Sequence, residues 1–329
     1  MELTTPVAIP KPPFTVGYRD AILLLGSCFA AEAGRRMSDD KLNVCINPFG
    51  ILYNPLSVEA ALRRLLGAET LTAGDLFFHN GLYHSFDHHG SFSAPIASEA
   101  LEAMNSRLLE GSKRLLEASR LIVTWGSASA YLLAGTERVA ANCHKLPASR
   151  FTRQRMEPNE IEGRWAALIE DILKANPGLR LAITVSPVRY LAEGARESRL
   201  GKAALLIAAD RLERRFPGVV TYFAAYEIMN DELRDYRFYA PDMIHPSPQA
   251  VDYIWEKFRE AFFGDEDRRL FAEWEPLRRA LGHRPSRPEG EAWRAFVAQT
   301  LLKAEEVSRK FPYFDISRET ALLRSFLNT

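Results

Sequence analysis

Short apolar runs alternate along this chain with longer segments whose apolar residues recur at helical spacing. A short continuous run is typical of a strand buried on both faces, and a 3.6-residue period is typical of an amphipathic helix. The alternation therefore predicts a parallel sheet covered by helices on both faces. The predicted strands are 21–25, a short one from 43, 121–125, 181–185 and 219–223; the predicted helices are 28–38, one capped by Ser57, 98–118, 159–175, 197–216 and 247–262.

The two ends of the chain differ from this pattern. Residues 1–19 contain four prolines and little periodicity, which predicts an extended N-terminal arm. Residues 264–329 are rich in Arg and Glu, contain no strand-like run and predict a helical extension interrupted around 282–290. We therefore expect an arm, an α/β domain over 20–263 and a C-terminal helical extension. The extension could close the active site, mediate dimerisation or cover apolar surface.

Composition narrows the class of protein. Lys+Arg and Asp+Glu both number 42, so no net charge draws the whole protein toward nucleic acid or an anionic membrane. Three cysteines form no disulfide framework, which favours a reducing compartment. The sequence shows no signal-peptide pattern and no apolar run of membrane-spanning length. We expect a soluble cytoplasmic protein with neither nucleic acid nor membrane as a partner.

One serine stands where a nucleophile is often found. The first predicted strand stops at Gly26-Ser27, and a strand that turns sharply into a helix presents such a side chain at the sheet edge. Residues 242–245 read Asp-Met-Ile-His, just before the helix of 247–262. Ser27 could be the nucleophile, His245 its base and Asp242 the group that orients the imidazole. The plainer alternatives are a helix-capping serine, a histidine within a turn and a capping or solvated aspartate.

Residues 75–93 gather aromatic and histidine side chains. His84, Asp87 and His88 could coordinate a metal, line a sugar-binding rim or belong to a surface loop. We assign His84 and His88 to substrate binding and expect neither a metal nor another cofactor. Arg234 and Arg237 alternate with aromatic residues just before the Asp-x-x-His motif. They could hold an acyl carboxylate, a phosphate or a sugar ring, or they could pair with nearby carboxylates in a packed loop.

Six blocks, in order, resemble the GSCFA family. They are Gly-Ser-Cys-Phe-Ala at 26–30 and the segments at 47–50, 142–145, 184–187, 233–239 and 242–247. The resemblance covers roughly residues 15–262. The family resembles the SGNH/GDSL hydrolases, so the resemblance implies a three-layer α/β/α, SGNH-hydrolase-like (flavodoxin-like) parallel sheet.

The resemblance also implies roles for individual residues. Ser27, Asp242 and His245 match the catalytic residues of SGNH-type enzymes, and Gly50 matches the glycine of the oxyanion hole. The Ser27 and Gly50 N–H groups are the first expected donors. The third block departs from the pattern, because Gly-Ser-Ala at 126–128 stands where Gly-x-Asn is expected. Asn142, which follows soon after, is the substitute donor.

Together these features predict a serine-dependent ester hydrolase or O-acyltransferase that works through an acyl-serine intermediate. The expected substrate is an acylated carbohydrate or a small metabolite. The chain could also form a homo-oligomer. The alternative is a non-catalytic protein that binds a glycan or metabolite, which the missing third-block asparagine favours. Hydrogen-bond reach between Ser27 Oγ and a His245 ring nitrogen separates the two hypotheses.

Overall fold

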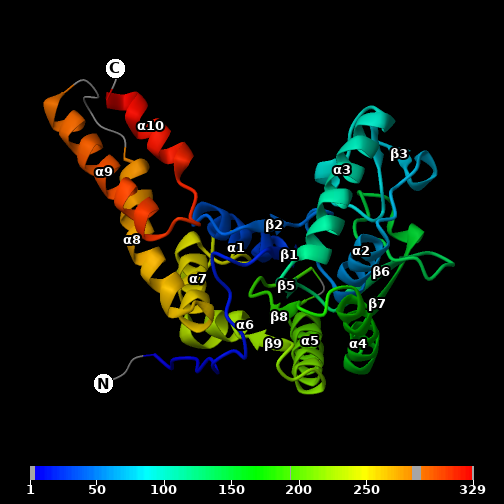
Figure 1. The fold of residues 1–329 in the computed structure, drawn as a ribbon. Coiled ribbons are helices and arrows are strands. Elements are labelled where there is room, and N and C mark those ends of the chain that lie inside the picture. The colour runs from blue at the N-terminus through cyan, green and yellow to red at the C-terminus, as the bar shows by residue number, and fades with distance from the viewer. Residues whose placement is uncertain (1–3, 193, 284–289, 328–329) are drawn as a thin grey trace.

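The computed structural model describes residues 4–192, 194–283 and 290–327, and a five-stranded parallel sheet lies at its centre (Figure 1). The strands run side by side in the order β2-β1-β5-β8-β9, which is the flavodoxin-like order 2-1-3-4-5 when the sheet strands are counted among themselves. The five predicted strands are confirmed. Their bounds are β1 (Ile22–Gly26), β2 (Val44–Ile46), β5 (Arg120–Trp125), β8 (Arg180–Val185) and β9 (Val220–Phe223).

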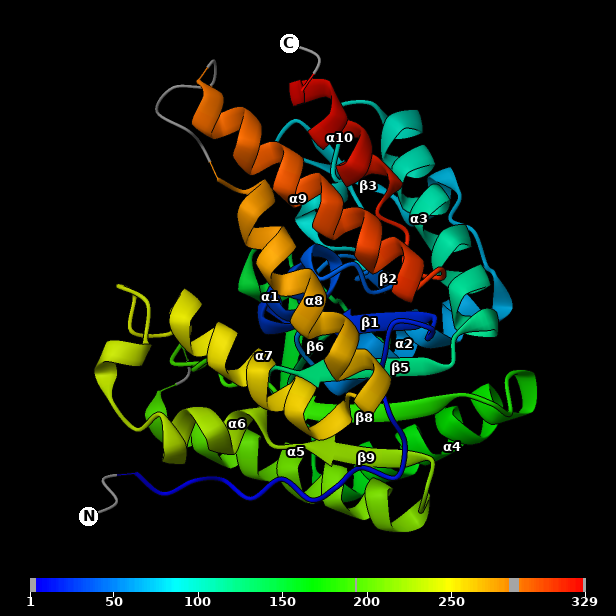
Figure 2. The ribbon, with the colours of Figure 1, turned by 60° about the vertical axis from the view of Figure 1, so that its left-hand side comes forward.

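Successive strand residues point to opposite faces, and each face has its own apolar core. In β1, Leu23 and Leu25 belong to one core, and Ile22 and Leu24 belong to the other. Figure 2 shows helices of the second core crossing one face of the sheet. The first core holds α2 (Pro55–Gly67), α3 (Ala97–Glu117), α4 (Pro158–Ala175) and α5 (Ala195–Arg215); the second holds α1 (Cys28–Asp39) and α7 (Pro248–Phe262).

Side-chain caps mark the starts of α2 and α7, and one of them differs from the prediction. Ser247 caps α7 as its hydroxyl accepts the Ala250 N–H at 3.2 Å. Ser57, predicted to cap α2, does not, because Asn54 is the cap and its Oδ1 accepts the Ser57 N–H at 2.8 Å. Pro55, whose fixed φ and missing N–H suit a first helical position, places the start earlier than predicted.

The C-terminal segment is helical, as predicted. It forms α8 (Asp265–Leu281), α9 (Glu291–Lys310) and α10 (Ser317–Leu327), which extend away from the sheet (Figure 1). Trp274 and Phe314 are buried in the second core with α1 and α7, so the extension covers apolar surface of this chain. Residues 4–19 run as an arm without helix or strand, and Val16 N–H donates to Phe262 O at 2.9 Å. Across the described residues, no helix is both long and apolar enough to cross a bilayer.

Two hairpins and a short helical segment have no counterpart in the predicted elements. The hairpins pair β3 (Phe77–His79) with β4 (Leu82–His84), and β6 (Ser129–Leu133) with β7 (Phe151–Arg155). Their short, half-exposed strands carry too few buried apolar positions to produce a run. The remaining elements are α6 (Ala225–Glu227), a π-helical turn (Ile228–Glu232) and 3₁₀ turns at Ala73–Asp75, Gly90–Phe92, Ala148–Arg150 and Tyr236–Phe238.

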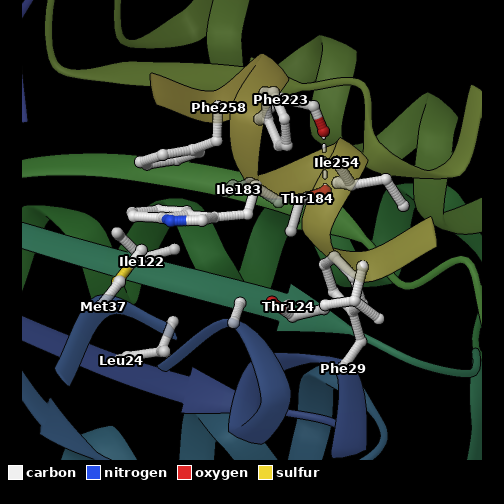
Figure 3. Close-up of a pocket in the computed structure, with 14 residues that line it drawn as sticks. Leu24, Phe29, Met37, Ile122, Thr124, Ile183, Thr184, Phe223, Ile254 and Phe258 are labelled. Atoms are coloured by element: carbon white, nitrogen blue, oxygen red, sulfur yellow. Dashed lines mark hydrogen bonds between the residues drawn. The ribbon is translucent and has the colours of Figure 1, made fainter. Parts of the chain in front are cut away.

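A small apolar cavity lies between the sheet and the α1 and α7 helices (Figure 3). Phe29, Met37 and Phe258 are among its lining side chains, and none of the lining residues is charged. The hydroxyl of Thr184, which also lines it, donates to Phe223 O at 2.7 Å. The cavity is a gap in the apolar core, whereas ligands of open parallel sheets bind at the carboxyl ends of the strands.

Candidate active site

Ser27 lies where β1 leaves the sheet, and Gly26 makes that exit possible. Gly26 has a φ of 144°, and a Cβ on it would stand 2.2 Å from the Thr124 carbonyl oxygen on β5. Only glycine fits both the conformation and the approach. Because strand order reverses between β1 and β5, Ser27 stands at the topological switch point, where ligands of open α/β sheets bind.

The Ser27 hydroxyl is free although Ser27 is buried. The residue occupies the N-cap position of α1, but its side chain makes no capping hydrogen bond. It is 1% exposed, and Oγ has no hydrogen-bond partner anywhere in the described chain. An unpaired buried hydroxyl costs about 1–3 kcal/mol. The capping alternative therefore accounts for the position of Ser27 but not for its side chain.

Asp242 and His245 are joined as the sequence predicts. His245 Nδ1 lies 2.7 Å from Asp242 Oδ2, and Asp242 Oδ1 accepts the N–H groups of Ile244 and His245 at 2.9 and 3.0 Å. These bonds, led by the His245 N–H, lower the pKa of Asp242 to about 2. An ionised carboxylate only accepts, so Nδ1 carries a proton and Nε2 is the nitrogen left to act as a base.

The pair is not bonded to the serine in this structure. Ser27 Oγ lacks any partner, whereas both side chains of the pair are roughly half exposed. The pair stands at the same sheet edge, because the N–H of Arg189, just past β8, donates to Ile244 O at 3.0 Å. A catalytic contact between Ser27 and His245 would therefore have to form when substrate binds.

The predicted oxyanion donors are already engaged. Ser27 N–H donates to Thr124 O at 3.2 Å, and Gly50 N–H donates to Asn47 O at 2.8 Å within a turn. Gly50 has a φ of 76°, and a Cβ there would stand 2.4 Å from the Cβ of His89. Its visible role is thus to let the histidine-rich segment approach the turn of residues 47–50.

Asn47 is the polar group beside Ser27 that sequence reasoning missed. It is buried, and its Oδ1 accepts the Gly26 N–H at 2.8 Å. Its Nδ2 is buried without a partner among the described residues. The available signal was an asparagine before proline, a residue that tolerates the left-handed φ of 43° seen here. A side-chain amide donor and a free serine hydroxyl thus flank Gly26.

Asn142 packs beside the histidine-rich segment. Its Oδ1 accepts the His144 N–H at 2.8 Å, and His144 Nε2 lies 2.8 Å from Ser85 O. A Cβ on Gly90 would stand 4.0 Å from Asn142 Nδ2. The loop of Asn142 is therefore stacked on the histidine-rich segment, and no hydrogen bond joins it to the Ser27 hydroxyl.

Two imidazoles of the histidine-rich segment, those of His84 and His88, are buried. His84 Nδ1 lies 2.6 Å from Ser93 Oγ and its Nε2 lies 3.0 Å from His79 O, so both nitrogens are used. Asp87 pairs with Arg64 at 3.1 Å and Arg138 at 3.5 Å. Within the described ranges, no three His, Cys, Asp or Glu residues are grouped to hold a metal ion.

His88 is the most buried of these histidines. Its ring lies 4.5 Å from Phe49 and 5.2 Å from Phe92 between centroids, and neither nitrogen has a partner in the described structure. Burial, reinforced by the charge of Arg64, lowers its pKa to about 3. His88 is therefore a neutral core side chain, and a substrate-binding role for it stays a prediction.

The substitution His88→Phe should make the free energy of unfolding less dependent on pH in the acidic range. Between pH 6.5 and about 3 the unfolded chain binds a proton at His88 and the folded chain does not, so folding weakens as pH falls. His88→Phe removes the contribution of His88 protonation to this pH dependence and keeps an aromatic ring against Phe49. We expect the free energy of unfolding, measured with urea, to fall less from pH 7 to pH 5 than in the wild type. The control is His283→Phe, because His283 is exposed. The prediction would be wrong if His88→Phe left the change in unfolding free energy between pH 7 and pH 5 as in the wild type, or if His283→Phe reduced it equally.

Lys202 is a second functional candidate that sequence reasoning missed. It is buried on α5, and Nζ donates to Gly126 O and Ser186 O, both at 2.6 Å. These carbonyls belong to the exits of β5 and β8. Burial lowers the Lys202 pKa to about 7, against a smaller opposing effect of Cys28. Because a Cβ on Gly126 would stand 3.2 Å from Ser27 Cβ, Lys202 holds a residue that touches the serine.

The two predicted substrate-binding arginines line one pocket together, and Arg234 alone of the two also lines a second pocket. The Arg237 guanidinium lies 4.8 Å over the ring of Phe238 and 3.7 Å from Asp235, in line with the packed-loop alternative. Arg234 lines a pocket beside the Asp242–His245 turn, together with Arg189 and Arg199.

Fold and site define an α/β protein with a buried serine at the switch point of its parallel sheet. Two protein-family models match this sequence. The one for the GSCFA family matches residues 21–258, and the one described as "GSCFA domain protein, C-terminal domain" matches residues 274–329. The chain therefore belongs to the GSCFA family. No curated protein matches it.

Proposed function

We propose that this chain is a serine-dependent ester hydrolase or O-acyltransferase on an SGNH-like fold, acting on an acylated carbohydrate or small metabolite. The observation that carries the proposal is the Ser27 hydroxyl, buried at the switch point and committed to no structural bond. The Asp242–His245 pair at the same edge supplies a base that is already oriented. The resemblance to SGNH hydrolases points the same way.

In the proposed reaction, Ser27 Oγ attacks the ester carbonyl carbon while His245 Nε2 takes the hydroxyl proton. The carbon–oxygen bond to the leaving alcohol then breaks, and His245 returns the proton to that alcohol. Water or a sugar hydroxyl then attacks the acyl-serine carbonyl carbon while His245 Nε2 takes its proton. The bond from the acyl carbon to Ser27 Oγ breaks, and His245 returns the proton to Oγ, which leaves free serine and an acid or a new ester. Asp242 stabilises the imidazolium throughout.

The tetrahedral intermediate needs hydrogen-bond donors. Because the Gly50 N–H is used within its turn, we assign this role to Asn47 Nδ2 and to the first-turn N–H groups of α1, which helix geometry leaves without intrahelical acceptors. One such donor typically contributes about 100- to 1000-fold to the rate. On this assignment, Asn47 takes the place of the asparagine that the third block lacks.

One observation favours the second candidate, a non-catalytic binding protein. Ser27 and His245 share no hydrogen bond, and Ser27 Oγ is covered. In a binding protein, Ser27→Ala would leave ligand affinity unchanged and no acylated sugar would be turned over. Closure of the pair onto Ser27 is what an enzyme would add.

Ester turnover with a base variant tests the proposal. His245→Gln should lower turnover of p-nitrophenyl acetate at least about 100-fold, because general-base catalysis typically contributes about 10²–10⁴-fold. His283→Gln, which changes a histidine of the C-terminal extension, should leave the rate within about twofold. Turnover that His245→Gln does not lower would overturn the proposed mechanism.

A further inference from the structure

Three arginines meet beside the turn that carries the candidate base. Arg189 follows β8, Arg199 lies near the start of α5 and Arg234 precedes the Asp242–His245 turn. These three side chains define what we call the arginine pocket. The other residues lining it are Met229, Asn230, Asp235, Tyr236 and Tyr239.

The carboxylate that lines the arginine pocket does not neutralise its three guanidinium charges. Its one lining carboxylate is Asp235, which accepts the Arg237 N–H at 2.9 Å and faces Arg237 Nε at 3.7 Å, outside the pocket. In the part of the chain that the structure describes, no ion pair joins the three arginines to a carboxylate. Guanidinium groups stay protonated at all ordinary pH values. The pocket therefore presents a fixed excess of positive charge.

One arginine of the pocket is hydrogen-bonded to the turn that carries the candidate base. Arg189 N–H donates to Ile244 O at 3.0 Å, and Arg189 Nη1 donates to Met243 O at 3.2 Å. Both carbonyls belong to the turn between Asp242 and His245. Arg189 therefore contacts both the arginine pocket and the turn that carries the candidate base.

The other lining groups suit a small polar ligand. The rings of Tyr236 and Tyr239 lie 6.1 Å apart between centroids, and Tyr236 is 67% exposed. Flat aromatic faces of this kind can pack against a sugar ring. Asn230 Nδ2 donates to Tyr226 O at 2.7 Å, which leaves its Oδ1 to accept from a ligand hydroxyl.

We propose that the arginine pocket binds the phosphate group of a phosphorylated small molecule, such as a sugar phosphate. Guanidinium groups match phosphate oxygens with paired, charge-assisted hydrogen bonds, and three of them suit a dianion better than a single carboxylate. That this molecule is the acyl donor or acceptor at Ser27 rests on the proposed function. The binding itself does not.

Calorimetry on the full chain tests the proposal. Inorganic phosphate and glucose 6-phosphate are titrated at constant ionic strength into the wild type, Arg199→Gln and Arg234→Gln. Both arginines are exposed, so these variants should fold normally. We expect saturable binding that each variant weakens at least about fivefold, because charge-assisted bonds to the ligand are lost. The matched control, Arg237→Gln, changes an exposed arginine of the same loop and should bind within about twofold of wild type.

Three outcomes would overturn the pocket: no saturable phosphate binding, equal weakening by Arg237→Gln, or acetate binding as tight as phosphate. Ester turnover by the wild type, measured beside the titration, separates the two proposals. Phosphate binding by a wild type without serine-dependent ester turnover would overturn the proposed enzyme and keep the arginine pocket. Serine-dependent turnover without phosphate binding would overturn the arginine pocket and keep the enzyme.

Discussion

Ser27→Ala should lose at least about a thousandfold in ester turnover and yet be no less stable than the wild type. The loss follows because the proposed reaction forms its covalent intermediate on Oγ. The stability follows because the wild-type hydroxyl is buried without a partner, which costs about 1–3 kcal/mol, and alanine removes that cost. A capping serine behaves in the opposite way, since its replacement by alanine costs about 0.5–2 kcal/mol.

The chain offers a matched control for this prediction. Ser247 is also an N-cap serine, but its Oγ accepts the Ala250 N–H at 3.2 Å. Urea unfolding should show Ser247→Ala destabilised by about 0.5–2 kcal/mol and Ser27→Ala unchanged or stabilised. If Ser27→Ala is destabilised as much as Ser247→Ala, Ser27 is a cap and the account of its hydroxyl fails.

Lys202→Met should slow ester turnover at least about tenfold, since a small displacement near the reacting atoms has a large effect on rate. Without the ammonium, Gly126 O and Ser186 O lose their donor, and the exit of β5 beside Ser27 is free to shift.

The effect of Lys202 on stability is expected to depend on pH. Its folded pKa of about 7 lies below the ordinary 10.5, so the unfolded chain binds more protons between these values.

The sign of that dependence follows from linkage. Folding stability contributed by Lys202 should rise by a few kcal/mol as pH increases from about 7 to 10.5. Tyrosines also ionise near the top of this range, so the informative quantity is the difference between wild type and Lys202→Met. We expect the wild type to gain on the variant from pH 7 to pH 9.5 in urea unfolding. A constant difference would mean that burial does not lower the pKa of Lys202 in the folded chain.

The sheet and the Asp242–His245 pair could be predicted because both depend on local sequence. A buried strand produces an apolar run, and an Asp-x-x-His turn brings its two side chains together within four residues. The start of α2 was misplaced because Ser57 and Asn54 are both good caps, and Pro55 decides between them.

The missed features depend on distant segments that meet only in the fold. Lys202 is one lysine among many charged residues until β5, β8 and α5 bring two carbonyls to its Nζ. Asn47 becomes a candidate donor only because β1 ends beside its turn. The arginine pocket joins three segments in the same way, and only Arg234 among its arginines had been singled out.

Reaction with a fluorophosphonate probe, followed by intact mass, is the most direct test of whether Ser27 is an activated nucleophile. We expect one adduct on the wild type, none on Ser27→Ala and a strongly slowed reaction on His245→Ala. Ser127 also follows a glycine at a strand end but is not the proposed nucleophile. The control variant Ser127→Ala should therefore react with the probe as the wild type does. A folded wild type that forms no adduct, or an adduct that persists on Ser27→Ala, would contradict this prediction.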